Sequence, residues 1–356
     1  METASISTSN SSSLRCRRLE FSQVPWEALD RFADRSVFQT REWIQFIAET
    51  QNAVPVVAEL TSGTEVLGYF TGLTVQRLGI RLLGSSFPGW TTPYIGFNLQ
   101  PRVARREALQ ALERFAFHDL KCLHLEVSDP HFAVEDGAGL GFNVDAYDSY
   151  ATDLTRSEDE LFQNMDSAAR RCIRKAEKSG VTIEEAHDGG FADEYYAQLQ
   201  DVFAKQGLVP TYSVDRVRAL VRHLLPTGRL LLLRARDGEG NCIGTGIYPG
   251  YNQTAEFWGN ASWRKYQLLR PNETLHWHAI RYWKRRGAAL FDWGGGGTYK
   301  EKYGVQKMSV PWFRKARYGW IDTARVYAKT FFDLRQRVLG RLRGDPTRVR
   351  KPDSDT

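Results

Sequence analysis

The sequence predicts an α/β protein in which mixed sheets are flanked by helices and one structural unit occurs twice in tandem. A pair of apolar strands joined by a turn is expected at residues 56–69, and a similar pair follows at residues 231–245. In each half a later helix leads into a short strand, at residues 102–127 and again at 274–293. Because repetition of one α/β unit is typical of domains that share a fold, the 356 residues predict two similar domains, each able to bury its own core.

The first half alternates apolar strands with amphipathic helices. A hairpin is favoured because Ser62 and Gly63 separate two apolar runs. A loop at residues 87–94, rich in Pro, Gly and aromatic residues, is typical of either a packing lid or a binding loop. Strands are expected at residues 54–60, 66–70, 80–83 and 122–127, helices at 41–50 and 102–119, and an extended crossing between domains at 141–152.

The second half begins with a capping box, in which Ser157 precedes Glu160 by three residues. We expect one helix over residues 157–179, whose apolar stripe consists of Leu161, Met165, Ala168, Cys172 and Ala176. Further helices are expected at 193–205, 214–224 and 322–343, and strands at 181–183, 229–235, 242–248, 255–260 and 310–320. The predicted division is a disordered start at 1–13, an N-terminal domain at 14–150, a C-terminal catalytic domain at 151–321, and a basic helix with a polar tail at 322–356.

Composition indicates a mildly basic globular protein. The formal net charge is +6 and the pI is near 9.1, which suits an anionic partner without requiring one. The four cysteines form no Cys-x-x-Cys pair, so neither a zinc site nor a disulfide framework is indicated, and a cytoplasmic location is expected. Residues 1–13 lack the apolar segment of a signal peptide, and no run of about 20 apolar residues predicts a transmembrane helix.

Residues 268–303 combine a helix start, an apolar strand and a glycine turn, and we expect the active centre there. Pro271 suits a first helical turn, and Glu273 complements the positive end of a helix that continues to residue 286. A short apolar strand at residues 288–293 ends at four glycines, 294–297. Strand ends beside a helix N-terminus are where α/β proteins bind anionic ligands.

Two motifs carry a resemblance to a known family. One is a basic segment at residues 170–181, and the other comprises Arg270-Pro271-Asn272, Leu275-His276-Trp277, Asp292-Trp293-Gly294-Gly295, Tyr299-Lys300 and Tyr303-Gly304. Over about residues 20–320 the chain resembles the FemABX family, aminoacyltransferases of peptidoglycan bridge formation, and the BioF2-like acyltransferases of the GNAT superfamily. The resemblance implies two tandem GNAT-like domains with the acyl-CoA N-acyltransferase fold.

Four basic residues of the first motif, Arg171, Arg174, Lys175 and Lys178, recur at three- and four-residue spacings and therefore share one helix face. Either a phosphate offsets their mutual repulsion, or the face is simply solvated and partly neutralised by Glu177. In the FemABX family, basic residues near this motif help to bind the diphosphate of a nucleotide-activated precursor. The resemblance therefore implies phosphate binding here.

The second motif contains the candidate catalytic residues, Lys300 and Asp292. The resemblance implies that Lys300 lies beside the reacting centre, where a cation would stabilise the oxyanion formed when an amine attacks an ester or thioester; Lys302 is the alternative. Asp292 ends the strand, where its carboxylate either accepts the amine proton or caps the glycine turn. The further candidates for substrate binding are Arg270, Asn272, Trp293, Gly294, Gly295, Tyr299, Lys302 and Tyr303, and family members commonly have Phe at both tyrosine positions.

No bound cofactor or metal is expected. His276 and His278 stand two positions apart on a helix and so face different directions. Residues 266–271 lack the glycines of the pyrophosphate signature found in CoA-dependent GNAT enzymes. That absence favours aminoacyl-tRNA as the donor co-substrate, or an acyl-CoA held by side chains. From Arg325 to Lys351 nine basic side chains stand against two acidic ones, which suits contact with tRNA, with an anionic membrane surface, or with the protein itself.

The sequence therefore predicts a transferase that moves an acyl or aminoacyl group onto an amine of a phosphate-bearing cell-envelope precursor. The acceptor is either a peptidoglycan precursor or a nucleotide- or lipid-linked sugar, and direct attack without a covalent intermediate is expected. Positioning of the amine against the carbonyl should provide most of the rate. Two alternatives stay open: an acyl-CoA-dependent N-acetyltransferase of exopolysaccharide biosynthesis, and a non-catalytic basic binding protein on a GNAT scaffold.

Overall fold

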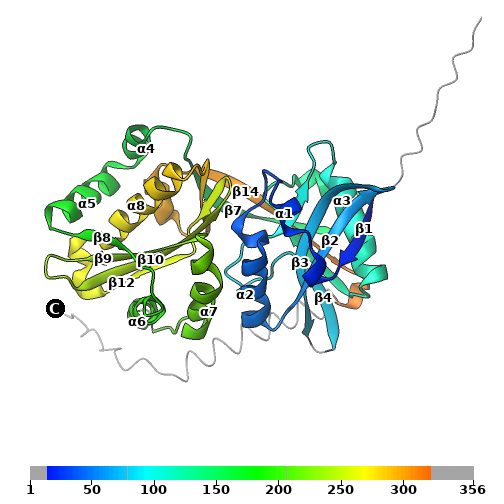
Figure 1. The fold of residues 1–356 in the computed structure, drawn as a ribbon, viewed down its shortest axis with the longest axis horizontal. Coiled ribbons are helices and arrows are strands. Elements are labelled where there is room, and N and C mark those ends of the chain that lie inside the picture. The colour runs from blue at the N-terminus through cyan, green and yellow to red at the C-terminus, as the bar shows by residue number, and fades with distance from the viewer. Residues whose placement is uncertain (1–13, 78, 206, 322–356) are drawn as a thin grey trace, which may run out of the picture.

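The structure, a computed structural model, describes residues 14–77, 79–205 and 207–321. Within these ranges the strands form one mixed sheet of 14 strands with helices packed against it, which confirms the predicted α/β class (Figure 1). Over the described residues, every helix is too short or too polar to cross a bilayer. The predictions for the first 13 residues and for the basic helix and tail at 322–356 fall outside the described residues.

The N-terminal half is built around the predicted hairpin. Its two strands pair antiparallel from Val54↔Thr74 to Ser62↔Glu65, because Ser62 and Gly63 begin a tight turn and Gly63 adopts a positive φ of 61°. The elements of this half are β1 (Arg15–Leu19), α1 (Trp26–Leu29), α2 (Arg41–Gln51), β2 (Val54–Ser62), β3 (Glu65–Arg77), β4 (Ile80–Gly84), β5 (Gly96–Leu99), α3 (Arg105–Arg114) and β6 (His124–Ser128).

The C-terminal half repeats an antiparallel strand pair, β9 and β10, with one helix layer above it and another below it in the view of Figure 1. Helix α8 begins at Pro271, as predicted. The elements are α4 (Glu158–Asn164), α5 (Ser167–Lys178), β8 (Thr182–Glu185), α6 (Phe191–Ala204), α7 (Val214–Leu224), β9 (Leu230–Arg236), β10 (Cys242–Tyr251), β11 (Thr254–Glu256), β12 (Gly259–Ser262), α8 (Pro271–Arg285), β13 (Leu290–Gly295) and the 3₁₀ segment η7 (Thr298–Tyr303).

Two long strands run through the middle of the sheet and connect the halves. Strand β7 (Asn143–Asp153) is the predicted extended crossing, and β14 (Gln306–Ala316) is the last strand of the described chain. β14 pairs antiparallel with β6 on one side and with β7 on the other, and β7 pairs in turn with β13. Backbone hydrogen bonding is therefore continuous across the predicted boundary at residue 150, and the division into two domains stays a prediction.

A shared apolar core also joins the halves. Helix α2 contributes Trp43 and Ile47, helix α7 contributes Leu220, and these residues belong to one buried cluster. Figure 1 shows α2 and α7 side by side between the halves. Trp90 and Tyr94, from the predicted Pro/Gly/aromatic loop, are buried in the same cluster. That loop is therefore held by packing from both halves, which positions it for the site described below.

The single helix predicted at residues 157–179 is wrong, because it is broken into α4 and α5. Met165 adopts an extended backbone (φ −68°, ψ 150°), and the N–H of Asp166 donates to the carbonyl of Lys302 at 2.9 Å. The capping box at Ser157 is confirmed. The break shifts the buried stripe by one residue, so Ala169 and Ile173 are buried whereas Ala168 is exposed.

The strand predicted at residues 255–260 is likewise divided in two. β11 lies between β10 and β13, whereas β12 pairs with β10. At the break, the N–H of Phe257 donates to the carbonyl of Asp292 at 2.8 Å, and the N–H of Trp258 donates to Ile247 at 3.1 Å. Successive residues thus bond to different strands. The chain turns away from β13 at this point. Glu256, Phe257 and Trp258, which lie at the turn, line a cavity.

Candidate active site

A cavity of about 400 Å³ lies between the two halves. Glu256, Phe257 and Trp258 line it from the end of β11, and Trp293, Gly294, Gly295 and Lys300 line it from β13 and η7. The other lining residues are Phe38, residues 86–93, Ser128, Tyr147 and Trp312. Eight of the 19 lining residues are aromatic. The predicted loop therefore forms a wall of the cavity at residues 87–93, and a binding role for it stays a prediction.

Two carboxyl groups meet at the base of the cavity. Glu256 and Asp292 are direct register partners on the parallel strands β11 and β13, and their side chains are 2% and 0% exposed. Asp292 does not line the cavity, whereas Glu256 does. The Tyr94 hydroxyl, from the opposite half, lies 3.0 Å from Oε1 of Glu256 and 2.9 Å from Oδ2 of Asp292. The carboxyl group that faces the cavity is thus Glu256, a residue that the sequence did not single out.

The two carboxyl groups differ in their surroundings. Oδ1 of Asp292 accepts hydrogen bonds from the N–H of Gly294 at 2.7 Å and from the Ser149 hydroxyl at 2.9 Å. Burial raises the pKa of Asp292, but these donors, Tyr94 and the Lys300 charge counteract that rise. Burial raises the pKa of Glu256 well above its usual range, and the neighbouring charge of Asp292 raises it further. The hydrogen bonds therefore stabilise the ionised form of Asp292 more than that of Glu256.

Lys300 lies beside this pair, and its ammonium group holds the glycine turn together. Nζ donates to the carbonyl oxygens of Trp293, Gly294 and Gly295 at 2.5, 3.2 and 3.0 Å. Gly294 has a φ of 67°, so the turn needs a residue without a β-carbon. Burial lowers the pKa of Lys300 to about 8, partly offset by Asp292. The glycine turn thus binds the lysine through its backbone carbonyls.

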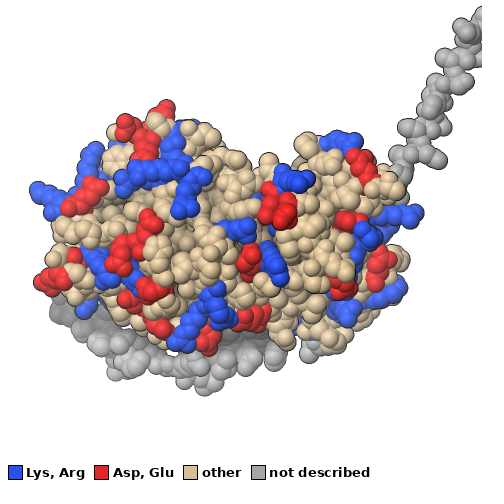
Figure 2. Space-filling model, viewed as in Figure 1, with Lys and Arg blue, Asp and Glu red and all other residues tan. Residues whose placement is uncertain are grey.

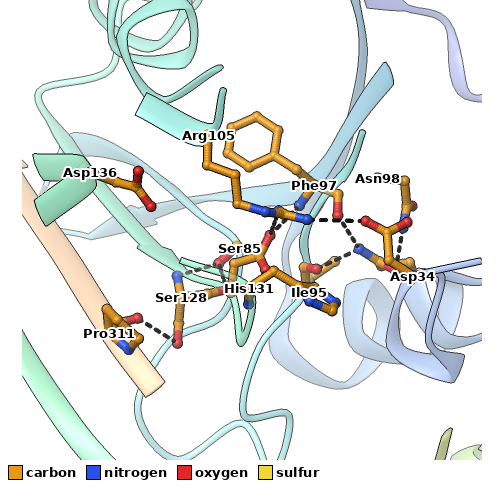
Figure 3. A network of polar contacts seen from close by, with 12 residues as sticks. Asp34, Ser85, Ile95, Phe97, Asn98, Arg105, Ser128, His131, Asp136 and Pro311 are labelled. Carbon is orange, nitrogen blue, oxygen red and sulfur yellow. Dashed lines mark hydrogen bonds and ion pairs between the residues drawn. The ribbon is translucent and has the colours of Figure 1, made fainter. Parts of the chain in front are cut away.

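Tyr94 is held in place by a polar network in the N-terminal half. The Gln39 amide donates to the carbonyl of the next residue, Ile95, at 2.6 Å. Arg105 of α3 donates to Asp129 at 3.0 Å and to Asp34 at 3.1 Å, as Figure 3 shows for Arg105 and Asp34. Gly96, the first residue of β5, has a φ of 71°, and a β-carbon there would stand 2.6 Å from Oδ2 of Asp129. The network therefore requires glycine and fixes the backbone that presents Tyr94.

On the far side of the same loop, Arg216 of α7 donates to the carbonyl oxygens of Gly89, at 3.0 Å, and of Trp90. Burial lowers the pKa of this guanidinium to about 10. One helix of the C-terminal half thus fixes a cavity wall that comes from the N-terminal half. Nothing in the local sequence around Arg216 indicated this role, because its partners lie more than 100 residues away.

The structure brings only some of the predicted site residues together. Trp293, Gly294, Gly295 and Lys300 line the cavity, and Asp292 lies directly behind Glu256. Tyr303 stacks on Trp293 with ring centroids 4.5 Å apart, so it supports the cavity from the core. Outside the lining lie Lys302, which pairs with Glu273 at 2.7 Å, Tyr299, and the α8 start with Arg270 and Asn272.

The four basic residues of α5 form a separate surface. Arg171, Arg174, Lys175 and Lys178 are all exposed, and none of them lines the cavity. Figure 2 shows Lys and Arg side chains gathered around α4 and α5 on this face of the molecule. Phosphate binding by these four residues stays a prediction, and its site is distinct from the cavity.

The double variant Arg174→Ala/Lys178→Ala should bind a nucleotide-linked sugar more weakly than the wild-type protein. Its free energy of unfolding should change by less than about 0.5 kcal/mol, because both side chains are exposed. Calorimetric titration and thermal unfolding measure the two quantities. Arg18→Ala/Arg77→Ala removes the same charge from exposed positions elsewhere and serves as the control. Equal binding by all three proteins would contradict phosphate recognition on α5.

Comparisons with known proteins agree with this architecture. Residues 163–303 match the family model described as Acetyltransferase (GNAT) domain, a range that contains Glu256, Asp292 and Lys300. The crystal structure of FemX is similar over 83% of this chain and 96% of that one, with a TM-score of 0.66 and 13% identity. The structure of L-PGS from Bacillus licheniformis is similar over 90% and 97%, with a TM-score of 0.50 and 10% identity. A comparison with curated protein sequences finds no match.

The likeness to FemX bears out the fold that the resemblance to the FemABX family implied. The chain therefore has the fold of FemX, and its residues 163–303 match an acetyltransferase (GNAT) domain.

Proposed function

We propose that the chain transfers an acyl or aminoacyl group onto an amine that enters the aromatic cavity. The observation that carries this proposal is Glu256, a buried carboxyl group of the GNAT domain that faces the cavity from the end of β11. An amine must lose a proton when it attacks a carbonyl carbon, and a carboxyl group within hydrogen-bond reach of that amine can accept the proton. The aromatic walls would exclude water, which strengthens every electrostatic interaction inside the cavity.

The cavity lining favours direct attack of the amine on the donor. All four cysteines lie outside the lining. The Ser86 hydroxyl donates to the carbonyl of Pro93 at 3.0 Å, and the Ser128 hydroxyl lies 3.2 Å from the Tyr147 hydroxyl and 3.4 Å from the carbonyl of Pro311. Among the described residues, the hydrogen bonds of these two serines do not involve a histidine or a carboxylate, the bases that activate a serine. The amine nitrogen would therefore form its bond to the carbonyl carbon in the step that leads to loss of the donor's sulfur or oxygen.

The acceptor is proposed to be an amine of a cell-envelope precursor on the cytoplasmic side of the membrane, as the FemABX resemblance implies. Its phosphates would bind to α5, outside the cavity, since Lys300 is the one cationic side chain among the described lining residues. The donor is acyl-CoA or aminoacyl-tRNA. Single-turnover assays of the full chain with each donor, and with amine-bearing peptidoglycan precursors or sugar nucleotides as acceptors, separate the bridge enzyme from the exopolysaccharide N-acetyltransferase.

Replacing Glu256 with Gln should lower the single-turnover rate by about 10²–10⁴-fold, the usual contribution of a general base. The amide keeps the shape of the side chain but cannot accept the amine proton. Glu239→Gln is the matched control, because Glu239 is exposed on the turn before β10. If the Glu256→Gln protein retains the wild-type rate, proton removal by this residue is wrong.

A further inference from the structure

We propose that Tyr94 relays a proton from Glu256 to Asp292, so that Glu256 can accept the amine proton in the cavity while its own proton leaves toward a carboxylate outside it. The inference rests on the proposed amine acylation. It gives a role to a contact between the two halves of the chain, in which the tyrosine comes from the N-terminal half and both carboxyl groups come from the GNAT domain.

The two hydrogen bonds of Tyr94 determine how many protons Tyr94, Glu256 and Asp292 share. Both distances from the Tyr94 oxygen, 3.0 Å to Glu256 and 2.9 Å to Asp292, are those of hydrogen bonds between oxygens. A phenol has one proton and can donate to only one of these acceptors. The second hydrogen bond therefore needs a carboxyl group that is itself protonated and donates to the phenol oxygen.

The surroundings decide which carboxyl group holds that proton. Asp292 accepts hydrogen bonds from Gly294 and Ser149 in addition to Tyr94, and these bonds stabilise its ionised form. Among the described residues, Glu256 is in hydrogen-bond contact with Tyr94 and receives no such stabilisation. At rest, the Glu256 hydroxyl therefore donates to the Tyr94 oxygen, and the Tyr94 hydroxyl donates to the Asp292 carboxylate.

A protonated Glu256 cannot act as a base unless its own proton leaves at the same time, and the relay provides that exit. As the amine nitrogen bonds to the carbonyl carbon, its proton passes to the cavity-facing oxygen of Glu256. The proton already on Glu256 moves to Tyr94, and the Tyr94 proton moves to Asp292. The bond to the donor's sulfur or oxygen breaks, and the leaving group departs with the electron pair. The leaving sulfur or oxygen then takes the proton from the cavity-facing oxygen of Glu256, and the relay runs back through Tyr94 to Glu256, so that Asp292 is again a carboxylate.

Other groups also influence the ionisation of this pair. Lys300 on η7 is a neighbouring cation that lowers the pKa of Asp292, and Tyr147 on β7 is a second phenol nearby. The Tyr147 hydroxyl donates to the carbonyl of Pro93 at 2.9 Å, so its proton is engaged outside the chain of three groups. Tyr94 is the one described side chain that contacts both carboxyl groups.

The test is Tyr94→Phe, which keeps the ring and removes the relay. Without the relay only ionised Glu256 can accept a proton, so the single-turnover rate at neutral pH should fall by about 10²-fold or more. It should then recover with rising pH, by about tenfold per unit below the pKa of Glu256. The wild-type rate should not show this recovery, and damage to the fold alone would not produce it. Tyr196→Phe, which removes a hydroxyl that donates to the Tyr212 carbonyl at 3.1 Å, is the control.

Infrared spectroscopy of the wild-type protein provides a second measurement that needs no substrate. The carbonyl stretch of a protonated carboxylic acid should be present at neutral pH and should disappear in Glu256→Gln. Its absence would overturn the relay. A Tyr94→Phe protein that transfers as fast as wild type at every pH would also overturn it. If the wild-type protein acylates no amine, the proposed function fails, and the infrared band still decides whether the resting proton lies on Glu256.

Discussion

Replacing Lys300 with Met is expected to lower the single-turnover rate of acyl transfer by about 10²–10³-fold, the usual effect of losing one group that stabilises a developing oxyanion. Lys300 lines the cavity beside the acid pair, and its buried ammonium contacts three backbone carbonyls of the glycine turn. Met has a similar length but no charge and no donor. The carbonyls of Trp293, Gly294 and Gly295 would also lose their partner, at about 1–3 kcal/mol for each one left buried without a hydrogen bond.

Lys302→Met is the matched control for this prediction. Lys302 is two residues away on the same 3₁₀ segment, but its ammonium pairs with Glu273 of α8 and does not line the cavity. The rate of the Lys302 variant should stay near that of wild type. If instead Lys302→Met loses the activity and Lys300→Met keeps it, the wrong lysine has been assigned. If both keep it, the basic segment is structural and the catalytic interpretation of the glycine turn fails.

The pH dependence of stability gives an independent readout of Lys300. Its pKa is about 8 in the folded protein and near the ordinary 10.5 when unfolded. Between these values the unfolded chain binds more protons than the folded one, so the free energy of unfolding should rise with pH across this window. Lys300→Met should lack this rise, and denaturant unfolding of both proteins at several pH values measures the difference. Identical pH profiles would mean that the ammonium is not desolvated.

The parts of the fold that the sequence predicted are those set by neighbouring residues. The hairpin of β2 and β3 follows from a turn between apolar runs, and α8 follows from Pro271 and a helical apolar spacing. The placement of β14 between β6 and β7 was not predicted, because strand pairing over long separations leaves no local pattern. The break at Met165 was missed for the same reason. The next residue, Asp166, donates its N–H to Lys302, which lies more than 100 residues along the chain.

The candidate site divides in the same way. Trp293, Gly294, Gly295 and Lys300 were predicted from one continuous strand and turn, and they do line a single cavity. Tyr94 reaches Asp292 across 198 positions of sequence, a contact that no motif specifies. A carboxylate within an apolar strand was the available signal for Glu256, since a buried charge in such a place needs a partner or a proton. The importance of Glu256 becomes clear only when β11 is placed beside β13.

Replacing Trp293 with Ala should destabilise the protein by about 3–5 kcal/mol, the usual range for truncating a buried aromatic side chain. The indole is fully buried and stacks on Tyr303 with ring centroids 4.5 Å apart and an interplanar angle of 12°. Its N–H donates to the Thr152 hydroxyl of β7 at 2.9 Å, so the variant would also lose a hydrogen bond between two central strands. Denaturant unfolding of both proteins measures the loss of stability, because a shift in midpoint at an unchanged m-value reports a change in the free energy of unfolding.

Trp320→Ala is the control for size and chemistry, because Trp320 is 59% exposed and its removal should change the free energy of unfolding by less than about 0.5 kcal/mol. Trp293→Phe should recover much of the stability, since it keeps the ring against Tyr303 and lacks only the indole N–H. A loss below about 1 kcal/mol in Trp293→Ala would show that the core beneath the cavity collapses into the space. In that case the stack of Trp293 on Tyr303 would not be what supports the cavity from the core.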